Sequence, residues 1–251
     1  MLDAIVVAGS DNSGPLRDCS NEPYEAMIRI GSKPMVSYVI DALKESGIVR
    51  RIVVAGPKQL GEFLTDDCVS VVQTKYGIIE NAVKALEYVD TSAPVLIATC
   101  DIPLLTARAV KDFVDISRKY DADFFYPIVS MNEVYSRFPE IERTSAKLKE
   151  GRFTGGNLFI VNPDAVPRSA EKAREFVNYR KSPVKLCRIL GFKFVFKLIL
   201  NMLSIPELED KVSEVLGINV KAVITKYPEI GIDVDKPSDY SIVSQYLDRS
   251  A

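Results

Sequence analysis

The sequence predicts an α/β fold of three layers, in which a mostly parallel sheet carries helices on both faces. Short, continuous apolar runs alternate with segments of helical periodicity along the first half of the chain. Strands that are apolar throughout are typical of parallel sheets buried on both sides. The composition of 47% hydrophobic and 26% charged residues is that of an ordinary globular protein, and agrees with this class.

The expected strands are short runs rich in valine and isoleucine. They lie at residues 4–8, 51–56, 69–73, 94–100, 123–129 and 220–228. Apolar residues recur at helical spacing in the segments between them. These helical segments are 33–47, 78–89 and 107–120. Gly47 supplies a helix stop, and Pro237 suits the first turn of a closing helix over 236–247.

The pattern changes in the second half of the chain. Residues 145–161 alternate between polar and apolar and contain Glu150-Gly151 between two extended runs, which predicts a hairpin that returns to the sheet. Residues 163–217 are mainly helical in pattern. We therefore expect one domain over residues 1–251, with 164–219 as a mainly helical insertion, which suits a length of 251 residues.

The composition excludes several classes of protein. A net charge of −2 and a pI near 5.5 argue against non-specific binding to nucleic acid, which needs basic surface. The four cysteines are scattered without a C-x-x-C pair, so neither a zinc site nor a disulfide framework is indicated. Since the first residues also lack the pattern of a secretory leader, we expect a protein of the reducing cytoplasm.

The chain contains no histidine, which narrows the chemistry further. Catalytic triads that need histidine, histidine general bases and histidine-ligated metals are excluded. Carboxylates, Lys, Arg, Tyr, hydroxyls and backbone amides remain. Magnesium held by oxygen ligands fits that inventory.

Aspartates lie near the expected carboxyl ends of the strands, which is where ligands bind in folds of this class. In open α/β sheets the ligand lies beyond the carboxyl ends of the strands. Asp101 follows the strand at 94–100 directly, and Asp233 and Asp235 stand two residues apart before the last helix. Together they could hold a magnesium ion. The alternative is structural, with Asp101 in a turn, Asp235 as a helix cap and Asp233 solvated.

Several segments, in their order along the chain, resemble a known superfamily. They are "VVAG", "GSKPMVSYVIDAL", "RIVVAG", "VLIATCDIPLL", "GGNLFIVNP" and "IDVDKPSDY". The sequence resembles the nucleotidyltransferases, which include molybdenum-cofactor guanylyltransferases, cytidylyltransferases and sugar-phosphate nucleotidyltransferases. The resemblance implies the fold of nucleotide-diphospho-sugar transferases. It also implies magnesium-dependent transfer from a nucleoside triphosphate to a phosphorylated acceptor, with release of pyrophosphate.

The resemblance also assigns expected roles to residues. The nucleotide-binding positions are Ala8, Gly9, Ser10, Gly14, Gln73 and Gly77, the acceptor-binding positions Gly155, Gly156 and Asn157, the catalytic positions Arg17, Lys33 and Asp101, and the Mg²⁺ ligands Asp101, Asp233 and Asp235. The glycines of the opening loop would let backbone amides approach the triphosphate. Two structural alternatives remain open: Gly77 could serve a helix start, and the pair at 155–156 could ease a bend in a strand.

The sequence departs from the family pattern in the opening loop, which keeps other functions open. Ser10 replaces a glycine, Asp11 adds a negative charge, and Glu25 stands where relatives carry a lysine that neutralises phosphate. These departures favour a nucleotide-binding regulatory protein without catalysis. A glycosyltransferase that uses a nucleotide-sugar donor is the third alternative, although no D-x-D motif follows the central strand.

An apolar segment at 186–205 is unusual for a soluble protein of this class. It is apolar nearly all round, and Lys193 and Lys197 lie one helical turn apart. It is short and interrupted for a transmembrane span. We expect a helix buried in the protein or in a homodimer. The alternative is a membrane-surface helix, or the lid of a pocket for a lipid-like acceptor.

Overall fold

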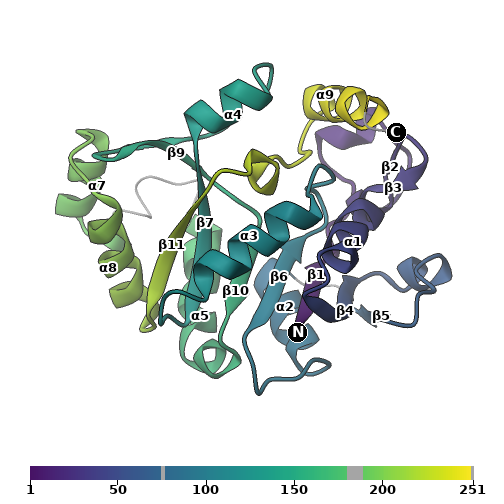
Figure 1. The fold of residues 1–251 in the computed structure, drawn as a ribbon, viewed down its shortest axis with the longest axis horizontal. Helices are drawn as coiled ribbons and strands as arrows, with labels where there is room; N and C mark the ends of the chain where they lie inside the picture. The colour runs from purple at the N-terminus through teal and green to yellow at the C-terminus, as the bar shows by residue number, and fades with distance from the viewer. Residues whose placement is uncertain (75–76, 180–188, 250–251) are drawn as a thin grey trace.

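The computed structural model describes residues 1–74, 77–179 and 189–249 (Figure 1). One large sheet runs through these residues, in the order β5-β4-β1-β6-β10-β7-β9-β8, with β11 beside β7. Its strands are β1 (Leu2–Val7), β4 (Val49–Gly56), β5 (Val69–Gln73), β6 (Val95–Thr99), β7 (Phe124–Ser130), β8 (Ala146–Leu148), β9 (Gly151–Gly155), β10 (Leu158–Val161) and β11 (Val220–Thr225). A separate two-stranded sheet pairs β2 (Arg29–Ile30) with β3 (Lys33–Pro34).

Helices connect the strands and follow the alternation expected from the sequence. They are α1 (Met35–Glu45), α2 (Ile78–Leu86), α3 (Ala107–Ser117), α4 (Met131–Arg137), α5 (Val166–Tyr179), α7 (Phe192–Ile199), α8 (Ile205–Leu216) and α9 (Pro237–Asp248). Short 3₁₀ turns are η1 (Pro15–Asp18), η2 (Glu25–Met27), η3 (Lys58–Glu62), η4 (Pro163–Ala165) and η5 (Pro228–Gly231).

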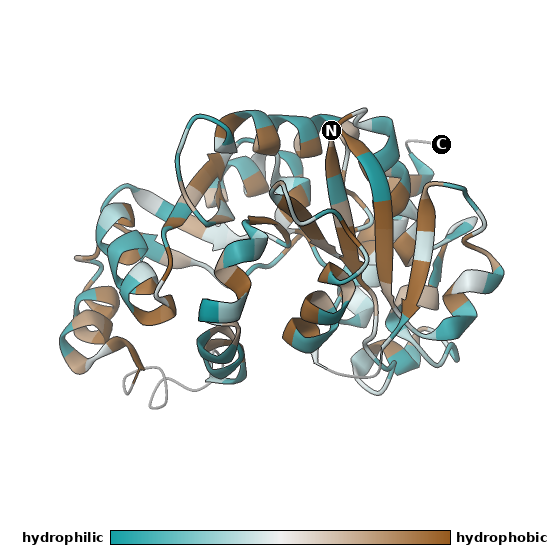
Figure 2. Ribbon diagram, turned by 90° about the horizontal axis from the view of Figure 1, so that it is seen from below, coloured by the Kyte–Doolittle hydropathy of each residue, from teal (hydrophilic) through white to brown (hydrophobic). Residues whose placement is uncertain are grey.

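The two faces of β1 show why the sheet has helices on both sides. Successive side chains of a strand point to opposite faces. Ala4 and Val6 pack in the cluster that contains the apolar residues of α1 and α3. Ile5 and Val7 pack on the other side, with residues of α2. Figure 2 shows the resulting arrangement, with apolar strands between layers of helices. The predicted fold class is therefore confirmed.

The sheet is parallel from β5 to β6 and mixed beyond that point. β10 lies antiparallel between β6 and β7, while β11 runs parallel to β7. The mixed half arises because the predicted hairpin is present. Leu148 pairs with Gly151 across its turn, and β9 then bends into β10. Gly151 has a φ of +144°, a conformation that glycine adopts easily.

Helix α4 was not expected from the sequence. It begins directly after β7, where the Ser130 hydroxyl accepts a hydrogen bond from the Asn132 amide. Only Met131 and Val134 of its seven residues are buried. A helix of two turns with two buried residues produces little periodicity, so the pattern is not visible in the sequence.

In the segment 186–205, α7 is only partly buried within the chain. Residues 186–188 lie outside the described part of the chain. Within α7, Val195 is buried, but Phe192 is 76% and Phe196 52% exposed. The helix therefore has one packed and one exposed side. In the described ranges, no helix is both long and apolar enough to cross a membrane.

Candidate functional site

The carboxyl ends of β1 and β6 lie at the same edge of the sheet, because these adjacent strands are parallel. The opening loop leaves β1 at this edge, and Asp101 follows β6 after one residue. The amide of Cys100 donates to the Val7 carbonyl at 3.1 Å, which fixes the chain just before Asp101. Asp101 is therefore held on a rigid part of the fold.

The segment after η5 crosses this edge and brings Asp233 and Asp235 to Asp101. The amide of Val234 donates to the Asp101 carbonyl at 2.9 Å, and the amide of Asn157 donates to the Ile230 carbonyl at 2.9 Å. The segment after η5 is thus held by backbone hydrogen bonds, to Asn157 beside β10 on one side and to Asp101 after β6 on the other.

Asp101, Asp233 and Asp235 form an acidic cluster. Each offers a carboxylate oxygen, and these oxygens lie within 4.8 Å of one another. Burial, and next the charge of Asp233, raise the pKa of Asp101 to about 7. Three carboxylates this close disfavour full ionisation unless a cation joins them. Their oxygen atoms are the ligands that Mg²⁺ prefers, so the residues present fit a divalent cation.

Thr99, Arg143 and Asn157 contact the acidic cluster through their side chains. The Thr99 hydroxyl donates to Asp101, and both terminal nitrogens of Arg143 donate to Asp233. The Asn157 side-chain amide also donates to Asp233, at 3.3 Å. Asn157 was expected to bind the acceptor, and the structure places it beside the acidic cluster. Thr99 and Arg143 were not expected from the sequence.

Glu25 also lies close to the acidic cluster. Burial raises the pKa of Glu25, and the charges of Asp235 and Asp11 raise it further. Its backbone amide donates to the Ser10 carbonyl at 3.1 Å, which ties η2 to the opening loop. A half-buried carboxylate therefore occupies the region where relatives of this sequence are expected to carry a cation.

The opening loop is braced by its own side chains. The Asn12 amide donates to the carbonyls of Ser20 and Glu22, both at 2.9 Å. Arg17, which was expected to be catalytic, donates to the carbonyls of Asn21 and Glu22 at 3.0 and 3.3 Å. Its side chain is nevertheless exposed. The loop is thus an ordered structure rather than a simple polar turn.

Two glycines of the opening loop differ in their surroundings. A Cβ atom at Gly9 would lie 2.4 Å from Nδ2 of Asn81, whereas one at Gly14 would meet nothing within 4 Å. Gly9 is therefore required by contact with α2. Ala8, its neighbour, is fully buried, and Ser10 supplies the carbonyl for Glu25.

Thr74, which directly follows β5, lies beside Gly9. Gln73 ends β5 and is exposed, and Gly77 directly precedes α2. Thr74 is buried, and its hydroxyl oxygen would lie 3.7 Å from a Cβ atom at Gly9. The structure therefore places the predicted nucleotide-binding positions 9, 73 and 77 around one corner of the sheet edge, next to Asn81.

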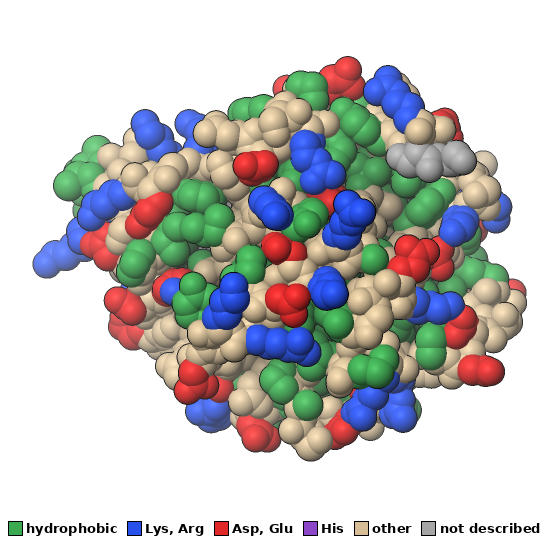
Figure 3. Space-filling view, viewed as in Figure 1, with side chains coloured by type: hydrophobic (Ala, Val, Ile, Leu, Met, Phe, Trp, Pro, Cys, Tyr) green, Lys and Arg blue, Asp and Glu red, His purple; other side chains and the backbone are tan. Residues whose placement is uncertain are grey.

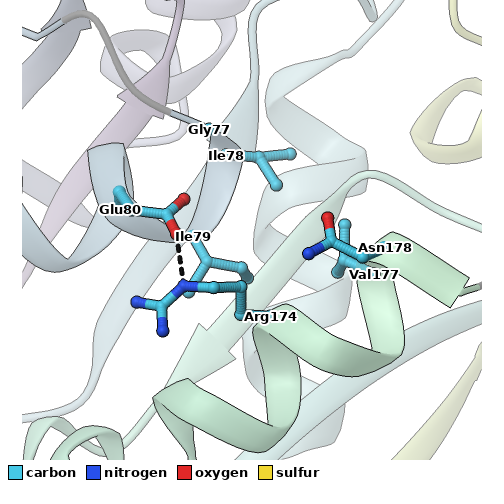
Figure 4. A pocket seen from close by; sticks show the side chains of 7 residues that line it. All are labelled: Gly77, Ile78, Ile79, Glu80, Arg174, Val177 and Asn178. Atoms are coloured by element: carbon cyan, nitrogen blue, oxygen red, sulfur yellow. Dashed lines mark hydrogen bonds and ion pairs between the residues drawn. The ribbon is translucent and has the colours of Figure 1, made fainter.

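A groove of about 360 Å³ lies between α2 and α5 (Figure 4). Its lining residues are Gly77, Ile78, Ile79, Glu80, Arg174, Val177 and Asn178. Glu80 and Arg174 form an ion pair across it. The groove begins at Gly77 but includes none of the three aspartates. It therefore adjoins the predicted nucleotide side of the site, and not the acidic cluster.

Lys33 has a partner outside the acidic cluster. Its ammonium group forms an ion pair with Asp41 of α1 at 2.5 Å and lies 5.7 Å from the ring centroid of Tyr38. Both charged side chains are substantially exposed. Such exposed pairs contribute little stability, about 0–1 kcal/mol, so Lys33 is held only weakly.

The glycine pair at 155–156 has a packing role. A Cβ atom at Gly155 would overlap the Tyr126 hydroxyl, and one at Gly156 would lie 2.6 Å from Cγ2 of Ile230. Close packing around a bend in the strand therefore explains why both positions are glycine. They let β9 bend closely past its neighbours, which places Asn157 opposite Asp233.

Charged side chains are mixed over the face seen in Figure 3, where acidic groups stand among Lys and Arg. No broad area of one sign covers this face.

The fold and the acidic cluster at the carboxyl edge define the class of protein, that of the nucleotidyltransferases. Residues 23–173 match the model of the MobA-like NTP transferase domain. Because this match covers more than half of the chain, the protein belongs to that family.

Solved structures agree with this assignment. The chain is similar to a hypothetical transferase from Thermus thermophilus, with 35% identity over 96% of this chain and all of that one, at a TM-score of 0.85. A nucleotidyl transferase from Methanothermobacter thermautotrophicus is 16% identical, with a TM-score of 0.61, over 100% of this chain and 99% of that one.

The CMP:2-keto-3-deoxy-manno-octonic acid synthetase, solved with CTP, is 13% identical, with a TM-score of 0.63, over 99% of this chain and 100% of that one. At such identities the last two structures show the fold alone. No curated protein matches the sequence.

Proposed function

We propose that the protein is a magnesium-dependent nucleotidyltransferase that joins a nucleoside triphosphate to a phosphorylated acceptor and releases pyrophosphate. The acidic cluster carries this proposal, because three carboxylates meet at the sheet edge between the opening loop and Asn157. Family membership supports the nucleotide as substrate. The acceptor is a small molecule, or a lipid-like molecule that bears a phosphate.

The reaction needs little proton transfer, which suits a chain without histidine. An acceptor phosphate oxygen attacks the α-phosphorus, and the bond from that phosphorus to the leaving pyrophosphate oxygen breaks. The attacking oxygen is already anionic, so no general base is required. Catalysis then consists of positioning and charge neutralisation.

The acidic cluster would hold the metal ion through Asp101, Asp233 and Asp235. When bound, Mg²⁺ would offset the negative charge of the phosphates. The Thr99 hydroxyl orients Asp101 by its hydrogen bond. On the acceptor side, Asn157 presents its amide at the same place, where a sugar hydroxyl or phosphate oxygen can accept from it.

The nucleotide would lie across the opening loop. Ala8, Gly9 and Ser10 would present backbone to the triphosphate, with Gly14 at the far side of the loop. The base would lie near Gln73 and Gly77.

Arg17 and Lys33 would supply cations for the phosphates. Both side chains are exposed or weakly paired, so a substrate can recruit them at small cost.

One observation favours a second function, nucleotide binding without catalysis. Glu25 is half-buried next to Asp235 and Asp11, and a triphosphate would bring more negative charge to the same region. A regulatory protein of this fold would bind a nucleotide and release no pyrophosphate.

A thermal-shift screen of the four nucleoside triphosphates, with and without magnesium, tests the proposal. A ligand that binds only the folded state raises the melting temperature. We expect one triphosphate to raise it only when magnesium is present, and Asp101→Asn to abolish the shift. Asp115→Asn, at an exposed aspartate of α3 outside the proposed site, is the matched control and should keep the shift. A shift of equal size in Asp101→Asn would contradict the proposed site.

A further inference from the structure

Arg143 is a charged side chain that the proposed reaction does not use. It lies in the loop between α4 and β8, and its side chain is only 16% exposed. Its two terminal nitrogens donate to the two oxygens of Asp233, whose side chain is 15% exposed. One of the three expected metal ligands is thus already neutralised by a buried cation.

The position of Arg143 leaves one of its donors unused. Its Nε is buried and has no hydrogen-bond partner among the described residues. A buried donor without a partner destabilises the folded state, so it calls for an explanation. The contact with Asp233 therefore does not satisfy the whole guanidinium group.

The loop that carries Arg143 is fixed on both sides. Ile141 is buried in an apolar cluster, and the Thr144 carbonyl accepts a hydrogen bond from the Thr154 hydroxyl at 2.9 Å. Any displacement of the guanidinium group is therefore a rotation of the side chain. The group would stay near the acidic cluster after such a rotation.

We propose that Arg143 is a latent anion-binding site, held on Asp233 until a divalent cation enters the acidic cluster and displaces it, and then bound to the phosphate of the acceptor. This inference rests on the proposed function, since it requires a metal at Asp101, Asp233 and Asp235. It adds a residue for the acceptor and an order of binding, in which the metal precedes the anion.

Electrostatics gives the direction of the exchange. A divalent cation and a guanidinium group that share Asp233 repel one another strongly, because both lie in a region of low dielectric. Asp233 is also contacted by Asn157, so its oxygens are already crowded. The cation gains three carboxylates, whereas Arg143 loses one.

A phosphate offers Arg143 one more acceptor oxygen than the carboxylate of Asp233 does. The planar fork of arginine matches two phosphate oxygens, and a third oxygen is free to accept from a further donor. The unused Nε of Arg143 could then be satisfied. The anion would lie beside Asn157, where the predicted acceptor position is.

Calorimetric titration with Mn²⁺ alone tests the exchange, because it reads the metal affinity and needs no catalysis. Arg143→Gln removes the competing cation, and we expect it to bind Mn²⁺ at least tenfold more tightly than the parent protein. Arg137→Gln is the matched control. Arg137 is paired at 2.9 Å with Glu229, a carboxylate that is 2% exposed and lies outside the acidic cluster. It should bind Mn²⁺ like the parent.

Inorganic phosphate tests the second half of the proposal. In the parent protein, magnesium should tighten the binding of phosphate at least fivefold. In Arg143→Gln this coupling should be lost. Arg143→Lys keeps the charge but not the fork, and should give intermediate values for both ligands, which keeps the test valid should the glutamine variant fail to fold.

The outcomes separate this inference from the proposed function. Weaker or unchanged Mn²⁺ binding in a folded Arg143→Gln, with normal binding in the parent, would overturn the exchange and leave the metal site standing. If only Arg143→Lys folds, weaker or unchanged Mn²⁺ binding in that variant would likewise overturn the exchange and leave the metal site standing. Absence of Mn²⁺ binding in the parent, in Arg143→Gln and in Asp101→Asn would overturn both proposals.

Discussion

Asp101 shows how one side chain is prepared for a cation by its surroundings. The backbone before it is fixed by β1, and the Thr99 hydroxyl fixes its carboxylate. Burial and the nearby Asp233 raise its pKa to about 7. Without a cation, the Asp101 carboxyl group is therefore only partly ionised in the folded protein at neutral pH.

This pKa predicts how stability depends on pH when metal is removed. A carboxyl group whose pKa is raised on folding stabilises the protein fully below its unfolded-state pKa of 3.8, and this stability is lost as the pH rises to about 7. Asp101→Asn does not titrate. Relative to the parent, its unfolding free energy should therefore increase by about 4 kcal/mol between pH 4 and pH 8.

Urea unfolding in EDTA at several pH values measures this difference. Asp115→Asn serves again as the control, because its aspartate is exposed on α3 and lies outside the acidic cluster. A difference between Asp101→Asn and the parent that stays constant from pH 4 to pH 8 would mean that Asp101 has an ordinary pKa.

Glu25 allows a second test at the same scale. Glu25→Lys replaces a half-buried carboxylate next to Asp235 and Asp11 with a cation. We expect the substitution to tighten binding of the preferred triphosphate about tenfold, measured by titration calorimetry, because it removes one repulsion and adds one attraction.

Glu22→Lys, in the same loop, is the control for a general increase in positive charge. A gain confined to Glu25→Lys supports nucleotide binding across the opening loop. Weaker binding in Glu25→Lys would show that the loop is built around the glutamate for another ligand.

Sequence reasoning singled out the three aspartates and Asn157, but neither Thr99 nor Arg143. Asp101 follows a strand, and Asp233 and Asp235 precede a helix, so their spacing is informative. Arg143 lies in an irregular loop and contacts Asp233 across 90 residues. No local pattern marks such a contact.

At the scale of elements, α7 shows how composition alone is misleading. The helix is apolar nearly all round, yet only one side packs, with Phe194 and Leu198 against the cluster under β8 and β9. Phe192 and Phe196 stack on each other at the outer side, 6.2 Å between ring centroids. The edge of α7 that faces outward is at the end of the molecule opposite α9 (Figure 1).

This arrangement predicts different outcomes for the two sides of α7. Phe192→Asp combined with Phe196→Asp should fold, with an unfolding free energy within about 1 kcal/mol of the parent, because both side chains are exposed. Val195→Asp should cost several kcal/mol, because it buries an unpaired carboxylate. Urea unfolding of the two variants measures this.

Sedimentation and vesicle flotation, compared between the parent and the folded double variant, then test what covers the exposed side of α7. Loss of a parent dimer would assign that side to a second copy, and loss of vesicle binding would assign it to a lipid surface. Equal destabilisation of the double variant and of Val195→Asp would contradict the packing described for α7.

At the scale of the whole molecule, the parallel half of the sheet could be predicted and the mixed half only in part. The apolar runs that form β1, β4, β5 and β6 alternate with helices, and this alternation dictates a parallel arrangement. The position of β10 between β6 and β7 depends on contacts between distant segments. Periodicity carries no information on such partners.

The same reasoning separates the site into two parts. Asp101 reaches the acidic cluster because parallel strands end at one edge of the sheet, and the segment after η5 brings Asp233 and Asp235 to it. The bracing of the opening loop by Asn12 and Arg17 depends on individual carbonyl groups. Such details become visible only in three dimensions.

The most direct test of nucleotidyl transfer follows two labels of the same triphosphate. The protein is incubated with a small-molecule extract, magnesium and each of the four nucleoside triphosphates in turn, labelled with ³²P at either the α- or the γ-phosphate. We expect the α-label to enter a new product and the γ-label to leave as pyrophosphate, and Asp101→Asn to form neither. Transfer of the γ-label to a product, or no product from any of the four triphosphates, would contradict the proposed function.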